Sequence, residues 1–175
     1  MKFLTLTACV AAAITLPGLA VAHATLEAKS APMNANHKAI MRISHGCDGE
    51  ATLSVTIEIP EGVINVKPMP KPGWKLTSVV EPYARTYEYY GPRSEGVTSI
   101  TWTGELDDGH YDEFVFRGRI TDAFEEDEVI YFPTTQLCAN GEHAWVEIPA
   151  AGQERGDLDS PAPGLTVTAD QHLHH

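Results

Sequence analysis

Basic side chains are scarce in this sequence. Its 175 residues hold 12 lysines and arginines against 24 aspartates and glutamates, a formal net charge of −12 at pH 7. Such an excess of negative charge repels phosphate backbones, so the composition argues against nucleic acid as a partner and favours the attraction of cations. The sequence also lacks the GxSxG and HExxH motifs and a phosphate-binding glycine loop, so it carries no signature of those catalytic or phosphate-binding sites.

Long apolar runs are missing too, apart from a short one at the start. Residues 1–22 contain a basic residue, a short apolar segment, a proline and an Ala-Val-Ala end. That order is typical of a secretory signal peptide, and the segment is too short to cross roughly 30 Å of hydrocarbon. We expect cleavage before His23, export to the periplasm or the outside, and no membrane-spanning segment. A lipoprotein cleavage box at residues 6–9 is the alternative, but it would leave almost no apolar region before the cut.

Cysteine is rare, with three residues in the chain. Cys9 falls in the expected signal peptide, which leaves Cys47 and Cys138 as an even pair in an oxidising compartment. We predict a disulfide between them. Closing a loop of roughly 90 residues would stabilise the fold by about 4 to 5 kcal/mol in the chain-entropy model. Metal binding by two thiolates is the alternative, and the lack of a CxxC pair weighs against it.

Long helical patterns are also missing, and apolar residues alternate with polar ones instead. Residues 51–59, ATLSVTIEI, follow a period of two and end at a Pro-Glu-Gly turn, as expected for a half-buried strand. Short strands between Gly, Pro and Asp turns predict an all-β fold, an antiparallel immunoglobulin/fibronectin-like β-sandwich. The other expected strands are 23–29, 38–45, 74–81, 85–90, 97–103, 111–120, 128–137 and 143–148.

Two segments are predicted to lie outside the strands. The prolines of residues 65–73 predict an extended, solvent-facing connection. After Pro149 the chain becomes small and polar, so we expect residues 150–175 to form a flexible polar tail. The folded domain is then expected to span residues 23–149.

His23 acquires a second donor if the signal peptide is cleaved in front of it. The freed α-amino nitrogen and the imidazole Nδ1 can bind one metal ion in a six-membered chelate. An α-amino group ordinarily has a pKa of about 7.7 to 8.0, so a metal displaces its proton readily near neutral pH. Nitrogen donors suit Cu(II), the tightest binder of the divalent first-row series. The alternative is that His23 is simply an arbitrary first residue.

Hairpin connections between the last strands would gather candidate residues at one end of the sandwich. The end of strand 128–137 would face the starts of strands 111–120 and 143–148, and a Cys47–Cys138 disulfide would add the end of strand 38–45. A strand that starts at His23 and runs antiparallel to strand 38–45 would begin there as well. On these assumptions His23, residues 109–114, Trp145 and Trp102 share one end.

An ordered set of motifs resembles the YcnI-like copper-binding domain family of exported bacterial proteins. The resemblance covers about residues 23–149. The motifs are a histidine at the expected cleavage point, Pro72-Gly73-Trp74, Ser99-Ile100-Thr101-Trp102, Tyr111-Asp112-Glu113-Phe114, Phe132-Pro133 with Gln136 and Cys138, and Trp145.

The resemblance implies a mono-histidine brace that holds copper through the N-terminal histidine, a carboxylate and a nearby tryptophan. On this chain the histidine is His23, the carboxylate is Glu113, and the tryptophan is Trp145, with Trp102 second and Trp74 third. A carboxylate offsets the charge of Cu(II), and an indole ring shields the ion from water. The resemblance also implies a role in copper homeostasis, with a PCuAC-type periplasmic chaperone and a CopD-type membrane importer as partners. No catalytic activity is expected.

Other metal ligands and other functions stay open. A copper oxygenase of the polysaccharide monooxygenase type also begins with a chelating histidine but needs a second one, and a CopC-like copper carrier has a similar N-terminus. The acidic run at 122–128 lacks the spacing of a calcium loop, so a solvated turn is expected there. Second-ligand candidates are His37, His45, His110 and His143, and a loose metal site could form at His172, His174 and His175.

Overall fold

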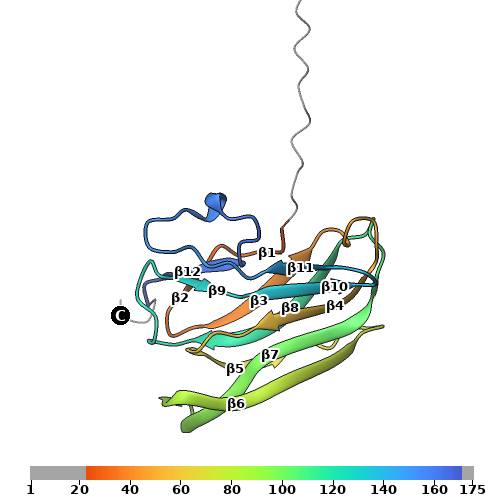
Figure 1. The fold of residues 1–175 in the computed structure, drawn as a ribbon. Coiled ribbons are helices and arrows are strands. Elements are labelled where there is room, and N and C mark those ends of the chain that lie inside the picture. Colours follow the sequence, from red (N-terminus) through yellow and green to blue (C-terminus); the bar gives the residue numbers. More distant parts are fainter. Residues whose placement is uncertain (1–22, 171–175) are drawn as a thin grey trace, which may run out of the picture.

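The computed structural model describes residues 23–170, and nearly every regular element in this part of the chain is a β-strand (Figure 1). The expected signal peptide and the three histidines after residue 170 lie outside the described residues. No helix in the described range is long and apolar enough to cross a membrane. The elements are β1 (Thr25–Leu26), β2 (Ser30–Pro32), β3 (Asn36–Ile43), β4 (Thr52–Glu58), β5 (Val63–Pro68), β6 (Lys75–Glu88), β7 (Pro92–Leu106), β8 (Asp112–Ile120), β9 (Val129–Tyr131), β10 (Thr134–Cys138), β11 (Glu142–Trp145), the 3-10 helix η1 (Arg155–Asp157) and β12 (Gly164–Thr168).

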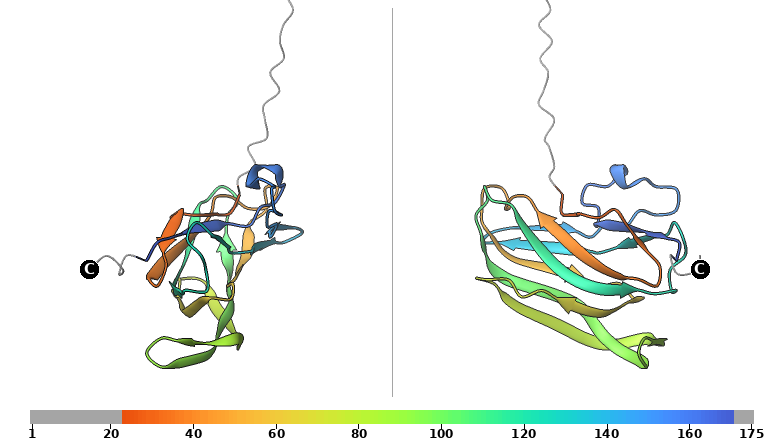
Figure 2. Two further views of the ribbon diagram at one scale, coloured as in Figure 1. Left: turned by 90° about the vertical axis from the view of Figure 1, so that its left-hand side faces the viewer. Right: turned by 180° about the vertical axis from the view of Figure 1, so that it is seen from behind.

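The strands form two facing layers, seen from three directions in Figures 1 and 2. One layer is a four-stranded sheet with the order β1-β3-β8-β5, and the other is a five-stranded sheet with the order β11-β10-β4-β7-β6. A small third sheet, β2-β12-β9, lies beside them. The prediction of an antiparallel, immunoglobulin-like β-sandwich is therefore confirmed.

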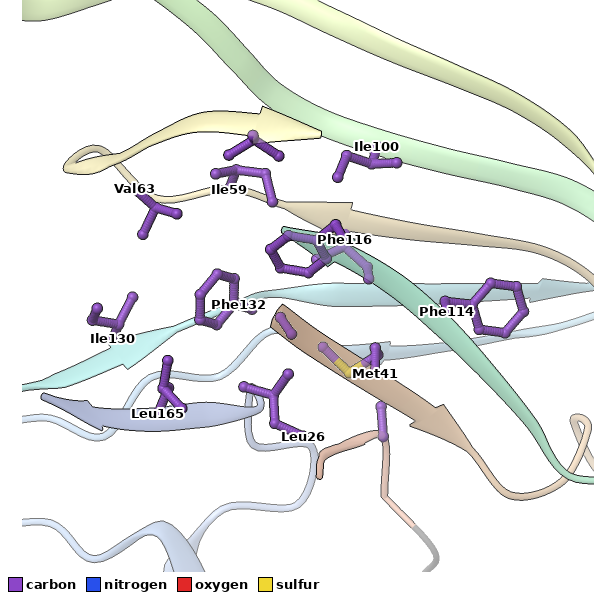
Figure 3. Close-up of a cluster of buried hydrophobic side chains, with 14 of the residues drawn as sticks. Leu26, Met41, Ile59, Val63, Ile100, Phe114, Phe116, Ile130, Phe132 and Leu165 are labelled. Carbon is purple, nitrogen blue, oxygen red and sulfur yellow. The ribbon is translucent and has the colours of Figure 1, made fainter. Parts of the chain in front are cut away.

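The hydrophobic core lies between the layers (Figure 3). Alternation along β8 turns Phe114 and Phe116 inward, and Phe132 meets Phe116 with a ring-centroid distance of 5.7 Å. Met41 of β3 is fully buried and accepts a sulfur hydrogen bond from the Thr134 hydroxyl of the opposite layer, at 3.8 Å. Each large apolar side chain buried in this way contributes about 1.5 to 3 kcal/mol of stability.

Several predicted strand boundaries are wrong. The expected connection at residues 65–73 begins within β5, whose Val63, Ile64 and Val66 side chains are buried. Its prolines misled the prediction because they stand at the end of β5, where the chain leaves the ladder. The expected strand 128–137 is split into β9 and β10 on either side of Phe132-Pro133, and the expected strands 74–81 and 85–90 fall largely within the single strand β6.

The predicted flexible tail is also wrong for the residues that the structure describes. β12 pairs in parallel with β2 and antiparallel with β9, so the domain extends well past residue 149. Ala162, Leu165 and Val167 are fully buried. The period-two pattern around Leu165 and Val167 is short and follows a polar stretch. The composition of the segment therefore does not reveal β12, the central strand of the third sheet.

The assumed hairpin order is correct in one place and wrong in two. β10 and β11 do form an antiparallel hairpin. However, β8 pairs with β3 and β5 rather than with β10, and β7 pairs with β4 and β6 rather than with β8. Consecutive strands here often lie in different layers, as the Greek-key connections of sandwiches require. Trp102 is therefore not beside residue 111 within one sheet.

Candidate metal centre

The start of β1 lies at the end of the sandwich where β3 finishes and β8 begins. Thr25 pairs with Arg42 of β3, and Arg42 pairs in turn with Glu113 of β8. If the same register is continued by two residues, His23 lies opposite Ser44, the residue before His45. The expected antiparallel strand beside β3 is confirmed, and it starts two residues after His23.

His23 itself is half-buried. It borders a surface hollow of about 320 Å³. The far side of this hollow is formed by the segment after residue 149, which the composition had indicated to be a tail. The other lining residues are Thr25, Arg155, Gly156, Leu158 and Pro161.

Glu113 points away from the core and is already engaged by neighbours. Its Oε1 atom lies 3.6 Å from the Arg42 Nε atom and accepts a hydrogen bond from the Tyr111 hydroxyl. That hydrogen bond raises the pKa of Tyr111. Arg42 also pairs with Glu27, and the hydrogen bond between them raises the pKa of the guanidinium. The negative charge of Glu113 is thus balanced by Arg42 on the outer face of the four-stranded sheet.

Trp145 lies on the other side of that sheet. Its side chain is 4% exposed and belongs to the same core as Phe114, the residue that follows Glu113. Successive side chains of a strand point to opposite faces. The structure therefore places Glu113 and Trp145 on opposite faces of the four-stranded sheet.

The two other tryptophans are core residues. Trp102 is fully buried, and its Nε1 atom donates a hydrogen bond to the Met69 carbonyl oxygen at 3.1 Å. Trp74 is half-buried and meets the Phe114 ring edge-on, with a centroid distance of 4.9 Å. Trp102 packs against the same ring at 5.6 Å. Both therefore have structural partners around Phe114.

Two histidines that are far apart in the sequence meet beside Trp145. The imidazole of His143 lies with its ring centroid 5.3 Å from that of Trp145 and 5.9 Å from that of His45. His143 is carried by β11, whereas His45 follows the end of β3. The sequence makes both of them candidate second ligands, but no sequence pattern predicts that they meet. Their contact joins two different layers of the sandwich.

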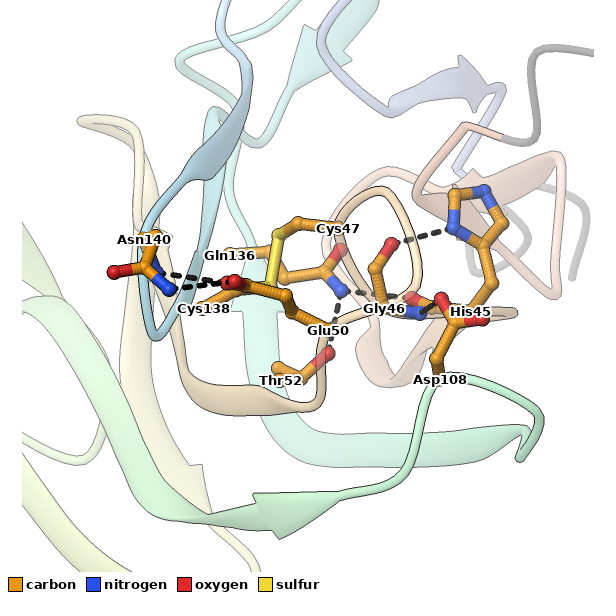
Figure 4. Close-up of a disulfide and its surroundings, with 9 residues drawn as sticks. All are labelled: His45, Gly46, Cys47, Glu50, Thr52, Asp108, Gln136, Cys138 and Asn140. Carbon is orange, nitrogen blue, oxygen red and sulfur yellow. Dashed lines mark hydrogen bonds between the residues drawn. A yellow bond between two sulfur atoms is a disulfide. The ribbon is translucent and has the colours of Figure 1, made fainter.

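The predicted disulfide is confirmed, and it holds the two segments that carry these histidines (Figure 4). Cys47 lies in the β3–β4 loop and Cys138 at the end of β10, with their Cα atoms 6.0 Å apart. A second link joins the same segments, since Glu50 accepts hydrogen bonds from the backbone N–H and the side-chain amide of Asn140 at 2.7 and 2.6 Å. Those bonds lower the pKa of Glu50.

Among residues 23–170, no group of three or more His, Cys, Asp or Glu side chains is arranged to hold a metal ion. The acidic run is an exposed turn, as expected, in which Asp122 lies 3.7 Å from the Arg85 guanidinium. His110 is exposed and lies 3.5 Å from the Asp107 carboxylate.

Comparisons with known proteins agree with this architecture. The family described as Domain of unknown function (DUF1775) matches residues 23–167. An uncharacterized protein from Nocardia farcinica, whose crystal structure reveals an immunoglobulin-like fold, is similar with a TM-score of 0.62. The two are 24% identical, and the match covers 83% of this chain and 98% of the other, so the likeness concerns the fold alone. No curated protein matches the chain.

Proposed function

We propose a function for this chain, which belongs to the family described as Domain of unknown function (DUF1775): it is an exported protein that binds Cu(II) at its processed N-terminus. The role is copper homeostasis or trafficking, as the resemblance to the YcnI-like copper-binding domain implies. On this proposal a PCuAC-type chaperone and a CopD-type importer are the exchange partners in the periplasm.

The position of His23 carries the proposal. His23 directly precedes β1, is half-buried, and borders a hollow large enough to admit an ion with its remaining water ligands. Ala24, its neighbour, is buried in the same core as Trp145. A chain that begins at His23 would therefore have its first residue anchored, so little conformational entropy would be lost when the chelate closes.

The chemistry of the chelate follows from the freed amine. The amine nitrogen and the imidazole Nδ1 of His23 would bind Cu(II) together, and the acidic surface of the protein favours the approach of a cation. The resemblance adds a carboxylate at Glu113 and an indole at Trp145. We take Glu113 as the carboxylate of the proposed centre. Continued by alternation from the Thr25–Arg42 pair, His23 faces the outer side of the four-stranded sheet, as Arg42 and Glu113 do, whereas Trp145 lies in the core behind that sheet.

One change to the N-terminus tests the proposal. Adding a single glycine before His23 turns the amine into an amide, whose proton a metal displaces far less easily, and leaves every side chain in place. We expect copper affinity to fall at least tenfold, which is about 1.4 kcal/mol. The measurement is a Cu(II) titration of correctly processed and glycine-extended protein, with matching thermal unfolding curves as the control for folding.

Equal affinity and identical copper spectra for the two proteins would reject an N-terminal centre. His23→Ala serves as the companion variant, since it keeps an amine but removes the imidazole, and it should weaken binding to a similar extent. The oxygenase alternative has its own assay, because it requires the copper-loaded protein to cleave chitin or cellulose when peroxide is added. On our proposal no cleavage occurs.

A further inference from the structure

We infer that Tyr111 is a positioning residue of the proposed copper centre: it holds one oxygen of the Glu113 carboxylate, so that the other oxygen is presented to the metal beside His23. The inference rests on the proposed function, because it concerns the carboxylate of the same N-terminal centre. Tyr111 does not bind the metal itself. Its hydroxyl keeps its proton and donates a hydrogen bond to Glu113.

The contacts of the Glu113 carboxylate all fall on one of its two oxygens. The Tyr111 hydroxyl donates to Oε1, and the Arg42 Nε atom lies 3.6 Å from the same oxygen. Within residues 23–170, no hydrogen bond or ion pair reaches Oε2 of Glu113. Carboxylates that bind metals are characteristically hydrogen-bonded by neighbouring groups, which orient them. Oε2 therefore keeps its lone pairs for a metal ion while Oε1 is held.

Strand register brings Tyr111 into the same row as His23. Continued by one residue past its last pair, the register of β3 and β8 sets Ser44 opposite Tyr111. The register of β1 and β3, continued in the same way, sets His23 opposite Ser44. Neighbouring strands lie about 4.8 Å apart, so the backbones of His23 and Tyr111 are about 10 Å apart, with both side chains on the outer face. Tyr111 thus lies at the end of β8 that is nearest to His23.

Arg42 supports the same oxygen without neutralising the surrounding charge. Its Nη2 atom pairs with Glu27, so the guanidinium is shared between two carboxylates. Pairing with Thr25 on one side and Glu113 on the other keeps the Arg42 backbone in the middle of the row. One positive charge therefore faces two negative ones, and the net negative charge of the group favours a divalent cation.

The backbone of Glu113 is fixed as well. Its N–H donates to the Asp112 carboxylate at 2.8 Å, and its carbonyl oxygen accepts a hydrogen bond from the Lys71 Nζ atom at 3.2 Å. Lys71 also pairs with Asp112 at 2.5 Å and lies 5.4 Å from the centroid of the Phe114 ring. Asp112 is therefore already paired, unlike Oε2 of Glu113. Contacts on the backbone and on Oε1 together pre-organise the remaining oxygen for binding.

A double-mutant cycle in correctly processed protein tests the inference, with Cu(II) titration as the measurement. Tyr111→Phe removes the hydroxyl and keeps the ring, and we expect copper affinity to fall about tenfold or more. In protein that already carries Glu113→Gln, the same change should have no further effect, because no carboxylate is left to position. Tyr90→Phe is the matched control and should leave the affinity unchanged, since Tyr90 is 90% exposed in the β6–β7 turn.

The visible spectrum of the copper-loaded, unchanged protein gives a second test that needs no variant. A tyrosine that binds copper directly produces a phenolate-to-copper charge-transfer band. We expect no such band, because the Tyr111 hydroxyl keeps its proton for Glu113. A band that disappears in Tyr111→Phe would make Tyr111 a ligand and overturn the inference.

The cycle can also overturn the inference in two ways. Unchanged affinity in Tyr111→Phe would show that Glu113 needs no positioning, and an equal loss with and without Glu113→Gln would show that Tyr111 acts independently of the carboxylate. The proposed function fails differently, through unchanged affinity when glycine is added before His23. The two failures are therefore distinguishable in one set of titrations.

Discussion

The two ends of the sandwich carry opposite kinds of nitrogen chemistry. The histidine end holds His23 just before β1, and His143 lies there between His45 and Trp145. The arginine end, where β8 finishes, has a cavity of about 270 Å³, and its lining residues are Asn34, Arg85, Thr86, Tyr87, Glu88, Arg119, Thr121 and Asp122. An imidazole can be a neutral ligand, whereas a guanidinium is always charged and has no lone pair to offer. The net charge of −12 therefore does not show where on the protein a cation can bind. The side chains at each end of the sandwich decide that.

The ends also differ in what holds them together. The histidine end has the Cys47–Cys138 bond and the buried amide of Gln136. At the arginine end Arg119 lies over the Tyr89 ring at 4.6 Å, and Arg85 pairs with Asp122 where both side chains are more than half exposed. Exposed ion pairs contribute little to stability. Ligands need fixed positions, so the end with covalent and buried support is the better place for a metal.

The largest expected effect comes from removing that covalent support. Changing Cys47 and Cys138 to serine opens a loop with a sequence separation of 91 residues, and the unfolding free energy should fall by about 4 to 5 kcal/mol. Copper affinity should fall as well, because the loop after β3, the strand that pairs with β1 beside His23, loses its link to β10. Urea unfolding and copper titration measure the two effects. Unchanged values for both would show that the disulfide does not distinguish the two ends.

A cavity placed outside the histidine end should separate stability from binding. Leu165 is fully buried in β12, and Leu165→Ala should lower the unfolding free energy by about 3 kcal/mol. Copper affinity should stay the same under conditions where the variant is folded. Thermal unfolding with and without copper provides the measurement. A stability equal to that of the unchanged protein would restore the view of this segment as a dispensable tail.

Glu113→Gln distinguishes the outer face of the histidine end from its inner face. The change keeps the shape of the side chain but removes the charge that Arg42 balances. Because the centre we propose lies on the outer side with His23, copper affinity should fall at least tenfold. The pKa of Tyr111, which the hydrogen bond to Glu113 raises, should fall towards its ordinary value in a spectroscopic titration. Unchanged copper affinity would remove Glu113 from the proposed ligand set.

The smallest effect is a pH dependence located near the arginine end. Burial lowers the pKa of His37 below the ordinary histidine value of 6.5, and its Nε2 atom has no hydrogen-bond partner among the described residues. A histidine that is less basic when folded stabilises the protein above the unfolded pKa, and this stability is lost as the pH falls below about 6.5. His37→Phe should therefore flatten the slope of unfolding free energy between pH values of about 7.5 and 5.5, while His110→Ala leaves it unchanged.

The strand pattern and the disulfide were predictable because they depend on local features. The alternation in β4 and β8 repeats every two residues, and removal of the expected signal peptide would leave Cys47 and Cys138 as the one possible pair. The prediction failed at β5 and β12, where prolines or a polar stretch masked short runs of buried residues. Short edge strands owe their existence to neighbours such as β2 and β9, which a window along the chain does not contain.

The sequence by itself determined the fold class and the disulfide, and it singled out His23 as a candidate ligand at an expected cleavage point. Only the tertiary structure decided which residues can share a site with His23. It assigned Glu113 and Trp145 to opposite sides of one sheet and brought His45 to His143 across two layers. The reason is physical: alternation sets the face of a side chain relative to its own strand, but the pairing of strands and layers sets what that face meets.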